Sequence, residues 1–263
     1  MAAPPDLPAI EARLLAFRSA GQLGQAQAWI RALAQQHPEL QGLARQWLWT
    51  HHPMWWSTPT GRRCRLRRRG PQDLAFVRHA WADERFVASF NPIAAALPAD
   101  DAALERILAR EHSAVLSRVP SLHWTIEALT GEPFGMLSLT DISLAHRRAE
   151  VLIGVLSPPY RGAATEATLL AIDFAFGPMK LAKLIGLVPA GNAASLAASE
   201  HIGFCREGLL RQHIIDPRSR QPIDLVHMAL LADDEAARSK QQRVRRRLLP
   251  QHAPVAAPAG RAA

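Results

Sequence analysis

The chain has 263 residues, of which 48% are hydrophobic and 21% charged, and its formal net charge is +8. These proportions are typical of folded globular chains and exclude the disordered, collagen-like and disulfide-scaffold classes. No apolar run reaches the roughly 18 residues of a membrane-spanning helix, and the N-terminus lacks a secretory signal pattern, so we expect a cytoplasmic protein outside the membrane.

Residues 9–36 predict two short helices with apolar residues at helical spacing, and a third helix follows them. Part of this stretch resembles the second half of a tetratricopeptide repeat: Gly21, Leu23, Ala26 and Ile30, followed by Pro38. Because a single repeat cannot bury its apolar face, these helices either pack on the domain behind them, which we favour, or offer a surface to a protein partner. Proline punctuation places a boundary near residue 58, which makes 1–57 a helical extension.

Two runs of basic residues account for the net charge, one over 61–70 and one from residue 236 onward. In an edge strand over 63–68, alternate arginines facing solvent would prevent edge-to-edge pairing, and we favour this over a site for nucleic acid or another phosphate. The second run leads into a Pro/Ala-rich stretch without periodicity. We therefore expect 236–263 to be a basic, disordered tail.

Between these ends, short strand-like and helical segments alternate. We expect strands over 63–68, 121–129, 134–143, 150–156, 182–188, 204–211 and 223–231. We expect helices over 71–82, 100–117, 163–176 and 193–202. The turn TGEP over 130–133 closes a hairpin. This order predicts an α/β fold with one mixed sheet in a compact domain over 58–235.

The segment 150–176 is an apolar strand that leads through a Pro/Gly turn into a helix. Small residues at Gly162, Ala163 and Ala164 would let a ligand approach the backbone, and the N–H groups of a helix N-terminus can hold a phosphate. The same arrangement is common in α/β proteins that hold no phosphate there. Neither cysteine has a metal-ligand spacing around it, so we expect no metal site.

Three segments, in order, resemble the GCN5-related N-acetyltransferases (GNAT), in particular the branch of the ribosomal-protein N-terminal alanine acetyltransferases. They are CRLRRRGPQDLAFVRHAW, PYRGAATEATLLAIDFAF and NAASLAASEHIGFCREGLLRQHI. The resemblance covers roughly 63–232 and implies the GNAT acyl-CoA N-acyltransferase fold. It also implies acetyl-CoA as acetyl donor, no metal, and a primary amine as acceptor: a protein N-terminus, a small-molecule amine or an amino sugar. Nucleic acid is not an expected partner.

In this family the cofactor lies in a wedge between two splayed parallel strands, here 150–156 and 182–188. The family's turn reads Gln/Arg-x-x-Gly-x-Gly/Ala, and here Pro159 stands in the first place while Gly162 and Ala164 fill the last two. The cofactor-binding residues that the resemblance implies are Leu156, Tyr160, Arg161, Gly162, Ala163, Ala164, Thr165 and Asn192.

Attack of an amine on a thioester needs a base for the amine proton and an acid for the leaving thiolate. Glu150 matches a glutamate that histone-acetylating members use as the base, and partial burial could raise its pKa toward neutrality. The alternative is an ordinary surface acid at a strand end. Asp141 and His146 are lesser candidates for the base.

The family's usual acid is a tyrosine in the last helix, and here Ser199 occupies that place. The resemblance offers Ser195 as the acid instead, while simple capping of the helix by Asn192 is the competing account. Because of Pro159 and the missing tyrosine, the alternative function is a catalytically idle module that binds partners through its helical extension.

Overall fold

The computed structural model describes residues 6–93, 96–113, 120–217 and 219–248. The chain divides into two compact units that meet in the sequence between Thr58 and Pro59, next to the boundary expected near residue 58. The first unit comprises the described residues up to Thr58 with Ser113 and Pro120, and the second comprises the remainder. None of the helices described here combines the length and apolar character that crossing a bilayer requires.

The first unit consists of α1 (Leu7–Ser19), α2 (Leu23–Gln36), the 3-10 turn η1 (Pro38–Leu40), α3 (Gln41–Thr50) and the 3-10 turn η2 (Pro53–Trp56). Asp6 caps α1 through its side chain, and Gly21, with φ +69°, forms the turn into α2. The helices share a cluster of buried side chains: Ile10, Leu14, Ala26, Ile30, Leu40, Ala44 and Trp47. This helical unit therefore has an apolar core of its own.

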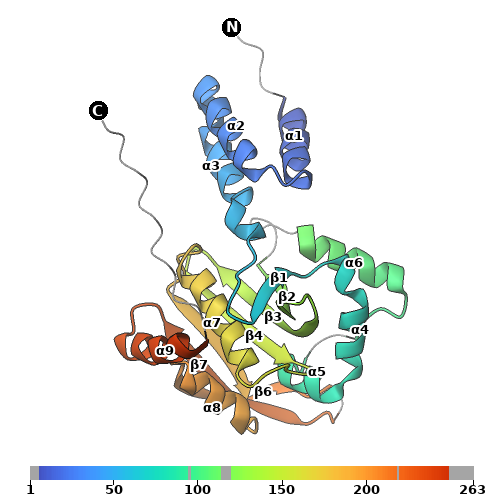
Figure 1. Ribbon diagram of the computed structural model, residues 1–263, viewed down its shortest axis with the longest axis vertical. Helices are drawn as coiled ribbons and strands as arrows, with labels where there is room; N and C mark the ends of the chain where they lie inside the picture. The colour runs from blue at the N-terminus through green and yellow to red at the C-terminus, as the bar shows by residue number, and fades with distance from the viewer. Residues whose placement is uncertain (1–5, 94–95, 114–119, 218, 249–263) are drawn as a thin grey trace. The chain divides into compact units, whose positions relative to one another are not determined.

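The second unit contains a mixed sheet and its covering helices (Figure 1). Its strands are β1 (Cys64–Arg68), β2 (Leu122–Ala128), β3 (Pro133–Ser143), β4 (Arg148–Val155), β5 (Lys183–Pro189), β6 (Cys205–Ile215) and β7 (Pro222–Leu231). Its helices are α4 (Leu74–Ala82) after the 3-10 turn η3 (Pro71–Asp73), α5 (Glu84–Phe90), α6 (Asp101–Ser113), α7 (Ala163–Phe176), α8 (Ala193–His201) and α9 (Glu235–Leu248). The expected α/β fold is confirmed.

The seven described strands lie in the order β1-β2-β3-β4-β5-β7-β6. Every neighbouring pair is antiparallel except β4 and β5, which run parallel. Because side chains alternate along a strand, the sheet presents two apolar faces. Met136 belongs to the cluster formed with α4, α5 and α6, whereas Trp124 meets Phe174 of α7 with ring centroids 5.4 Å apart.

The basic segment after residue 235 differs from our expectation. We expected residues 236–263 to be disordered, and this prediction is wrong for residues 236–248, because residues 235–248 form α9. Ala237, Gln241 and Val244 are spaced as one face of a helix and are buried, which supplies the packing that an arginine-rich helix needs. Residues 249–263 lie outside the described residues.

Two smaller differences concern the helices before the hairpin. Helix α6 spans Asp101–Ser113 where we expected 100–117, and residues 114–117 lie outside the described ranges. Helix α5 was not expected at all, because seven residues are too few for a clear periodicity. Asp83 begins it by accepting a hydrogen bond from the Phe86 N–H.

The arginine run of β1 lies at the sheet edge, as expected, but most of it is engaged inside the protein. Arg67 contacts Asp73 at 2.6 Å and Glu127 at 2.8 Å, and Arg69 contacts Glu111 at 2.7 Å. Arg69 is only 7% exposed. These guanidinium groups stabilise the edge of the sheet and are not presented to a nucleic acid.

Candidate active site

The parallel strands β4 and β5 separate along their length. They pair only from Arg148 with Lys183 to Glu150 with Ile185. Beyond that point β4 continues to pair with β3, and β5 continues to pair with β7. The backbone groups of β4 and β5 that face each other there have no strand partner, so the expected wedge between these strands is present.

Two helices begin at the open end of this wedge. Parallel strands end at the same edge of a sheet, and β4 leads into α7 while β5 leads into α8. The N-termini of α7 and α8 therefore lie at one edge of the sheet, beside the gap between β4 and β5. Helix N-termini carry partial positive charge and free N–H groups, which suit an anionic ligand.

The turn before α7 leaves backbone donors available. Gly162 is the N-cap residue, with φ +90°, and contributes no side chain. The Ala163 N–H donates to the Tyr160 carbonyl oxygen at 3.3 Å. The N–H groups of Ala164 and Thr165 have no hydrogen bond within the described part of the chain. The predicted residues Gly162, Ala164 and Thr165 thus form a place where a phosphate can accept backbone hydrogen bonds.

A buried glutamate fixes the shape of the same turn. Glu166 is 0% exposed and accepts hydrogen bonds from the Tyr160 hydroxyl at 3.0 Å and from the Arg63 N–H at 2.9 Å. Burial raises the pKa of Tyr160, as do Cys64 and Glu166 beside it, so the hydroxyl remains a donor. Tyr160, which we expected to contact the cofactor, is engaged in holding the turn against β1.

Two other predicted cofactor residues lie at the ends of the β4–α7 connection. The Leu156 N–H donates to the Phe134 carbonyl oxygen at 2.9 Å, and the Leu156 side chain packs beside the cluster under α4, α5 and α6. Arg161 is exposed and has no ion pair within the described residues. Leu156 is thus a packing residue here, whereas Arg161 is available to a ligand.

Glu150 lies at the last residue pair before β4 and β5 separate. Its carboxylate is half-buried, and the Thr140 hydroxyl lies 3.4 Å from Oε2 as a donor. Burial raises the pKa of Glu150, and the charge of Asp141 raises it further, while the Thr140 hydrogen bond and His213 lower it. A carboxylate whose pKa is raised toward neutral pH is suited to accepting a proton.

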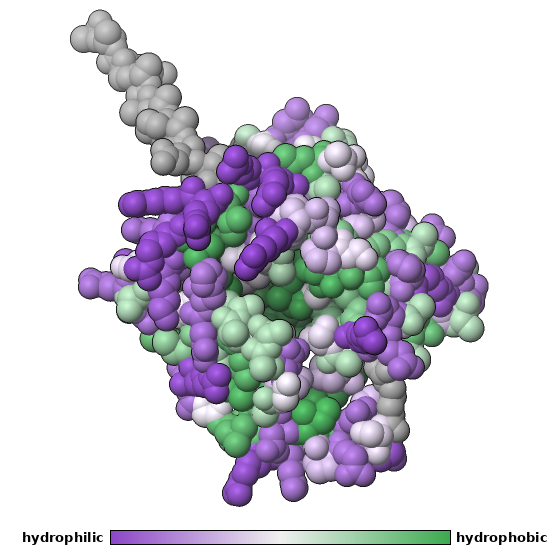
Figure 2. Space-filling view, turned by 60° about the horizontal axis from the view of Figure 1, so that its bottom comes forward, coloured by the Kyte–Doolittle hydropathy of each residue, from purple (hydrophilic) through white to green (hydrophobic). Residues whose placement is uncertain are grey.

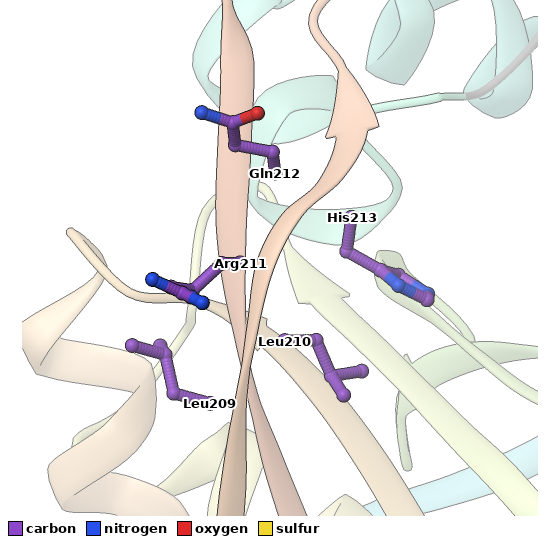
Figure 3. A pocket seen from close by; sticks show the side chains of 5 residues that line it. All are labelled: Leu209, Leu210, Arg211, Gln212 and His213. Atoms are coloured by element: carbon purple, nitrogen blue, oxygen red, sulfur yellow. The ribbon is translucent and has the colours of Figure 1, made fainter.

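His213, whose charge lowers the pKa of Glu150, belongs to strand β6, which is irregular at this point. The register with β7 shifts between Leu210 and Ile214, and Gln212 has φ +50°. The Gln212 N–H donates to Asp224 Oδ1 at 2.7 Å, which holds the bulge. From Leu210 to Ile214, β6 advances four residues while β7 moves by two, and such extra residues redirect the side chains around them. Figure 3 shows His213 and Leu210 on the same side of β6.

The bulge also borders a cavity of about 600 Å³. Its lining residues are Leu209, Leu210, Arg211, Gln212 and His213 (Figure 3). Sequence reasoning missed this region, because an irregular strand leaves no periodic signal.

Ser195, the predicted acid, lies in the first turn of α8, next to the capping residue Asn192. Asn192 Oδ1 accepts a hydrogen bond from the Ser195 N–H at 3.0 Å, so Asn192 caps α8. The Ser195 hydroxyl is half-buried and has no hydrogen bond to a described residue. Of the lesser base candidates, Asp141 is paired with Arg148 at 2.6 Å and His146 is exposed. Glu150 is thus the carboxylate best placed at the wedge.

A second cavity, of about 1140 Å³, lies among the start of α7, the end of α8 and one side of α9. It is lined by Arg161, Gly162, Thr165, Glu200, His201, Lys240, Arg243, Val244, Arg246, Arg247 and Leu248. Figure 2 shows hydrophilic side chains gathered on the side where α9 lies. The four cations of α9 were missed as site residues because that segment was expected to be disordered.

Across the described ranges, no group of three or more His, Cys, Asp or Glu residues could hold a metal ion.

Comparison with protein families matches residues 63–205 to the family described as acetyltransferase (GNAT) domain. Among curated proteins, spermidine N(1)-acetyltransferase of Escherichia coli K12 is 36% identical over 96 residues, which is 35% of this chain and 51% of that protein. The uncharacterized N-acetyltransferase YoaA of Bacillus subtilis is 30% identical over 95 residues, 35% of this chain and 54% of that protein. The chain spans about half the length of these curated relatives.

Solved structures of similar fold include two that hold CoA. RimJ of Mycobacterium smegmatis, in complex with CoA-disulfide, has a TM-score of 0.62 and 22% identity, over 75% of this chain and 99% of that one. Spermidine N-acetyltransferase of Vibrio cholerae, in complex with CoA and spermine, has a TM-score of 0.53 and 22% identity, over 64% of this chain and 95% of that one. At these identities the likeness concerns the fold.

Proposed function

The chain belongs to the acetyltransferase (GNAT) domain family, and on that premise we propose that it transfers acetyl from acetyl-CoA to a primary amine by direct attack. The observation that carries this proposal is the position of Glu150, a half-buried carboxylate of raised pKa at the point where β4 and β5 separate. A proton acceptor at the apex of a wedge, with free N–H groups at its open end, fits an amine and a phosphate-bearing acyl donor.

Each part of the site has a role in this proposal. The N–H groups of Ala164 and Thr165 bind phosphate oxygens of acetyl-CoA, which supplies the activated acetyl group. Glu150 accepts a proton from the attacking amine. The unpaired backbone groups of β4 beyond Glu150 can stabilise the developing oxyanion. Ser195, at the start of α8, relays a proton to the leaving thiolate, and Asn192 fixes the helix turn that holds it.

For the acceptor we propose a small-molecule polyamine. Two of the curated relatives are named spermidine N(1)-acetyltransferases, and their similarity to this chain covers about half of their length. The cavity beside the β6 bulge is the proposed entry for the amine, because one of its lining residues, His213, interacts electrostatically with Glu150. The resemblance to the ribosomal-protein branch makes a peptide N-terminus the second candidate.

We also propose a domain organisation for the chain. The helical, partly tetratricopeptide-like extension over 1–57 precedes an acetyltransferase domain over 58–235. Helix α9 belongs functionally to that domain, because it lines the cavity at the start of α7.

The test is a calorimetric titration of the full chain with acetyl-CoA, followed by an assay of thiol release with three acceptors. We expect saturable binding, and turnover with spermidine that exceeds turnover with an alanine-starting peptide or with glucosamine. Turnover with the peptide alone would assign the chain to the second candidate. No binding of acetyl-CoA at millimolar concentration would overturn the proposal as a whole.

A further inference from the structure

Helix α9 holds its basic side chains in a fixed position next to the α7 turn. Arg245 forms an ion pair with Asp173 of α7, and the Arg247 carbonyl oxygen accepts a hydrogen bond from Arg62 at 3.4 Å. Near the other end of α9, a Cβ on Gly203 would lie 3.0 Å from the Ala237 Cα, so the turn that follows α8 is in close contact with the backbone of α9. This docking makes α9 a wall of the domain.

The cations of α9 that line the cavity have no partners among the residues that the structure describes. Lys240, Arg243 and Arg246 line the cavity and make no hydrogen bond or ion pair with any described residue, and the same holds for Arg161. The one carboxylate in the lining, Glu200, is already bound by Arg206 at 2.6 Å. Like charges gathered without counter-charge repel one another, and an anionic ligand relieves that repulsion.

An anion that carries two phosphate groups fits the two sets of donors around this cavity. One group can accept hydrogen bonds from the N–H groups of Ala164 and Thr165 at the start of α7. Lys240 and Arg243 lie one helical turn apart on the facing wall, so both can contact a second group. CoA carries such a pair, a diphosphate and a separate 3′-phosphate on its ribose.

We propose that α9 is a binding element for the nucleotide end of acetyl-CoA, with Lys240 and Arg243 holding the 3′-phosphate. This inference rests on the proposed function and goes beyond it, because α9 lies outside residues 63–205 that match the family. Arginine and lysine both form charge-assisted hydrogen bonds with phosphate, which are stronger than neutral ones.

The experiment compares the double variant K240Q/R243Q with R45Q/R85Q in the full chain. Arg45 and Arg85 are exposed, have no described partner and are not among the residues that line the cavity, so the control removes the same amount of charge. Calorimetry measures Kd for acetyl-CoA and for 3′-dephospho-acetyl-CoA. We expect K240Q/R243Q to weaken acetyl-CoA binding by about tenfold or more, and to change binding of the dephospho form by no more than about twofold.

The outcomes separate this inference from the proposed function. If the wild type binds no acetyl-CoA, the proposed function fails and the inference fails with it. If the wild type binds and K240Q/R243Q has equal affinity, or loses equal affinity for both ligands, only the inference is overturned. Tighter binding by the variant would show that α9 obstructs the site, and loss of binding to a single-stranded RNA with acetyl-CoA binding intact would assign the cations to RNA. Each of these results also overturns the inference.

Discussion

At the scale of single residues, the chemistry depends on one carboxylate and its surroundings. Glu150 is kept from full hydration by its place in the sheet, and the nearby charge of Asp141 also disfavours its ionised form. Since its pKa is raised, the fraction of unprotonated Glu150 falls at a higher pH than it would for an exposed glutamate. A reaction that needs the carboxylate form should therefore lose rate as the pH falls.

The first prediction concerns Glu150→Gln. We expect kcat/KM near neutral pH to fall by about 100- to 10,000-fold, because the amide cannot take the amine proton, while acetyl-CoA affinity stays the same. The wild type should show an acidic limb, with the rate rising as pH increases, and the variant should lack that limb. A pH series of initial rates, with calorimetry of both proteins, measures this.

Asp141→Asn provides the matched control for the electrostatics. Removing the charge that raises the pKa of Glu150 should move the acidic limb to lower pH without abolishing it. A rate that is unchanged in Glu150→Gln would remove Glu150 from the mechanism.

At the scale of elements, the α7 turn combines an unusual backbone conformation with free donors. Gly162 has φ +90°, a region that side chains disfavour by about 1–2 kcal/mol. Space is not the obstacle, because the nearest atom to an added Cβ is Leu248 Cδ2 at 3.5 Å. A change at Gly162 therefore acts on the backbone, and through it on the N–H groups that follow.

The second prediction follows from this turn. Gly162→Ala should weaken acetyl-CoA binding, and Gly162→Asp should weaken it further by adding a negative charge where phosphate binds. Gly131→Ala is the control, because Gly131 also has positive φ, +96°, with no atom within 4 Å of its Cβ position. We expect similar losses of thermal stability in the two alanine variants, measured by calorimetry, but loss of affinity only at Gly162. Equal affinities would place the acyl donor elsewhere.

The elements also show what the sequence can predict. Helix α7 spans the expected 163–176, because its apolar residues and the Gly162 turn give a local signal. Helix α9 was missed, because its buried face is only Ala237, Gln241 and Val244, and this pattern is too weak to be recognised among arginines without the packing partner. The β6 bulge at Gln212 was missed as well, because its conformation depends on a distant partner, Asp224.

At the scale of the whole molecule, acid should weaken the folded state through His123. Burial, together with the charges of Arg69 and Arg68, lowers the pKa of His123 to about 3. The His123 Nδ1 lies 2.8 Å from the Ser138 hydroxyl. The unfolded chain therefore binds more protons than the folded chain between the ordinary histidine value and pH 3, so this contribution to stability is lost as the pH falls through that window.

The third prediction is that His123→Gln flattens this dependence. Below pH 6, each further unit of acidification should lower the free energy of unfolding of both proteins. The decrease should be larger for the wild type than for the variant, by up to about 1.4 kcal/mol per pH unit. Urea titrations at several pH values measure the difference. The control is His79→Gln at an exposed histidine, which should show the same dependence of unfolding free energy on pH as the wild type. Equal pH dependence in His123→Gln and wild type would contradict the prediction.

The hydrogen bond from the Arg63 N–H to Glu166 joins residues 103 positions apart. Contacts so distant in sequence form late in folding, after local helices and hairpins, because closing a long loop costs entropy first. The α7 turn therefore gains its final support only when the first strand of the domain has docked at the sheet edge. The turn that is proposed to hold the acyl donor is in this way completed late in folding, when the first strand of the domain docks beside α7.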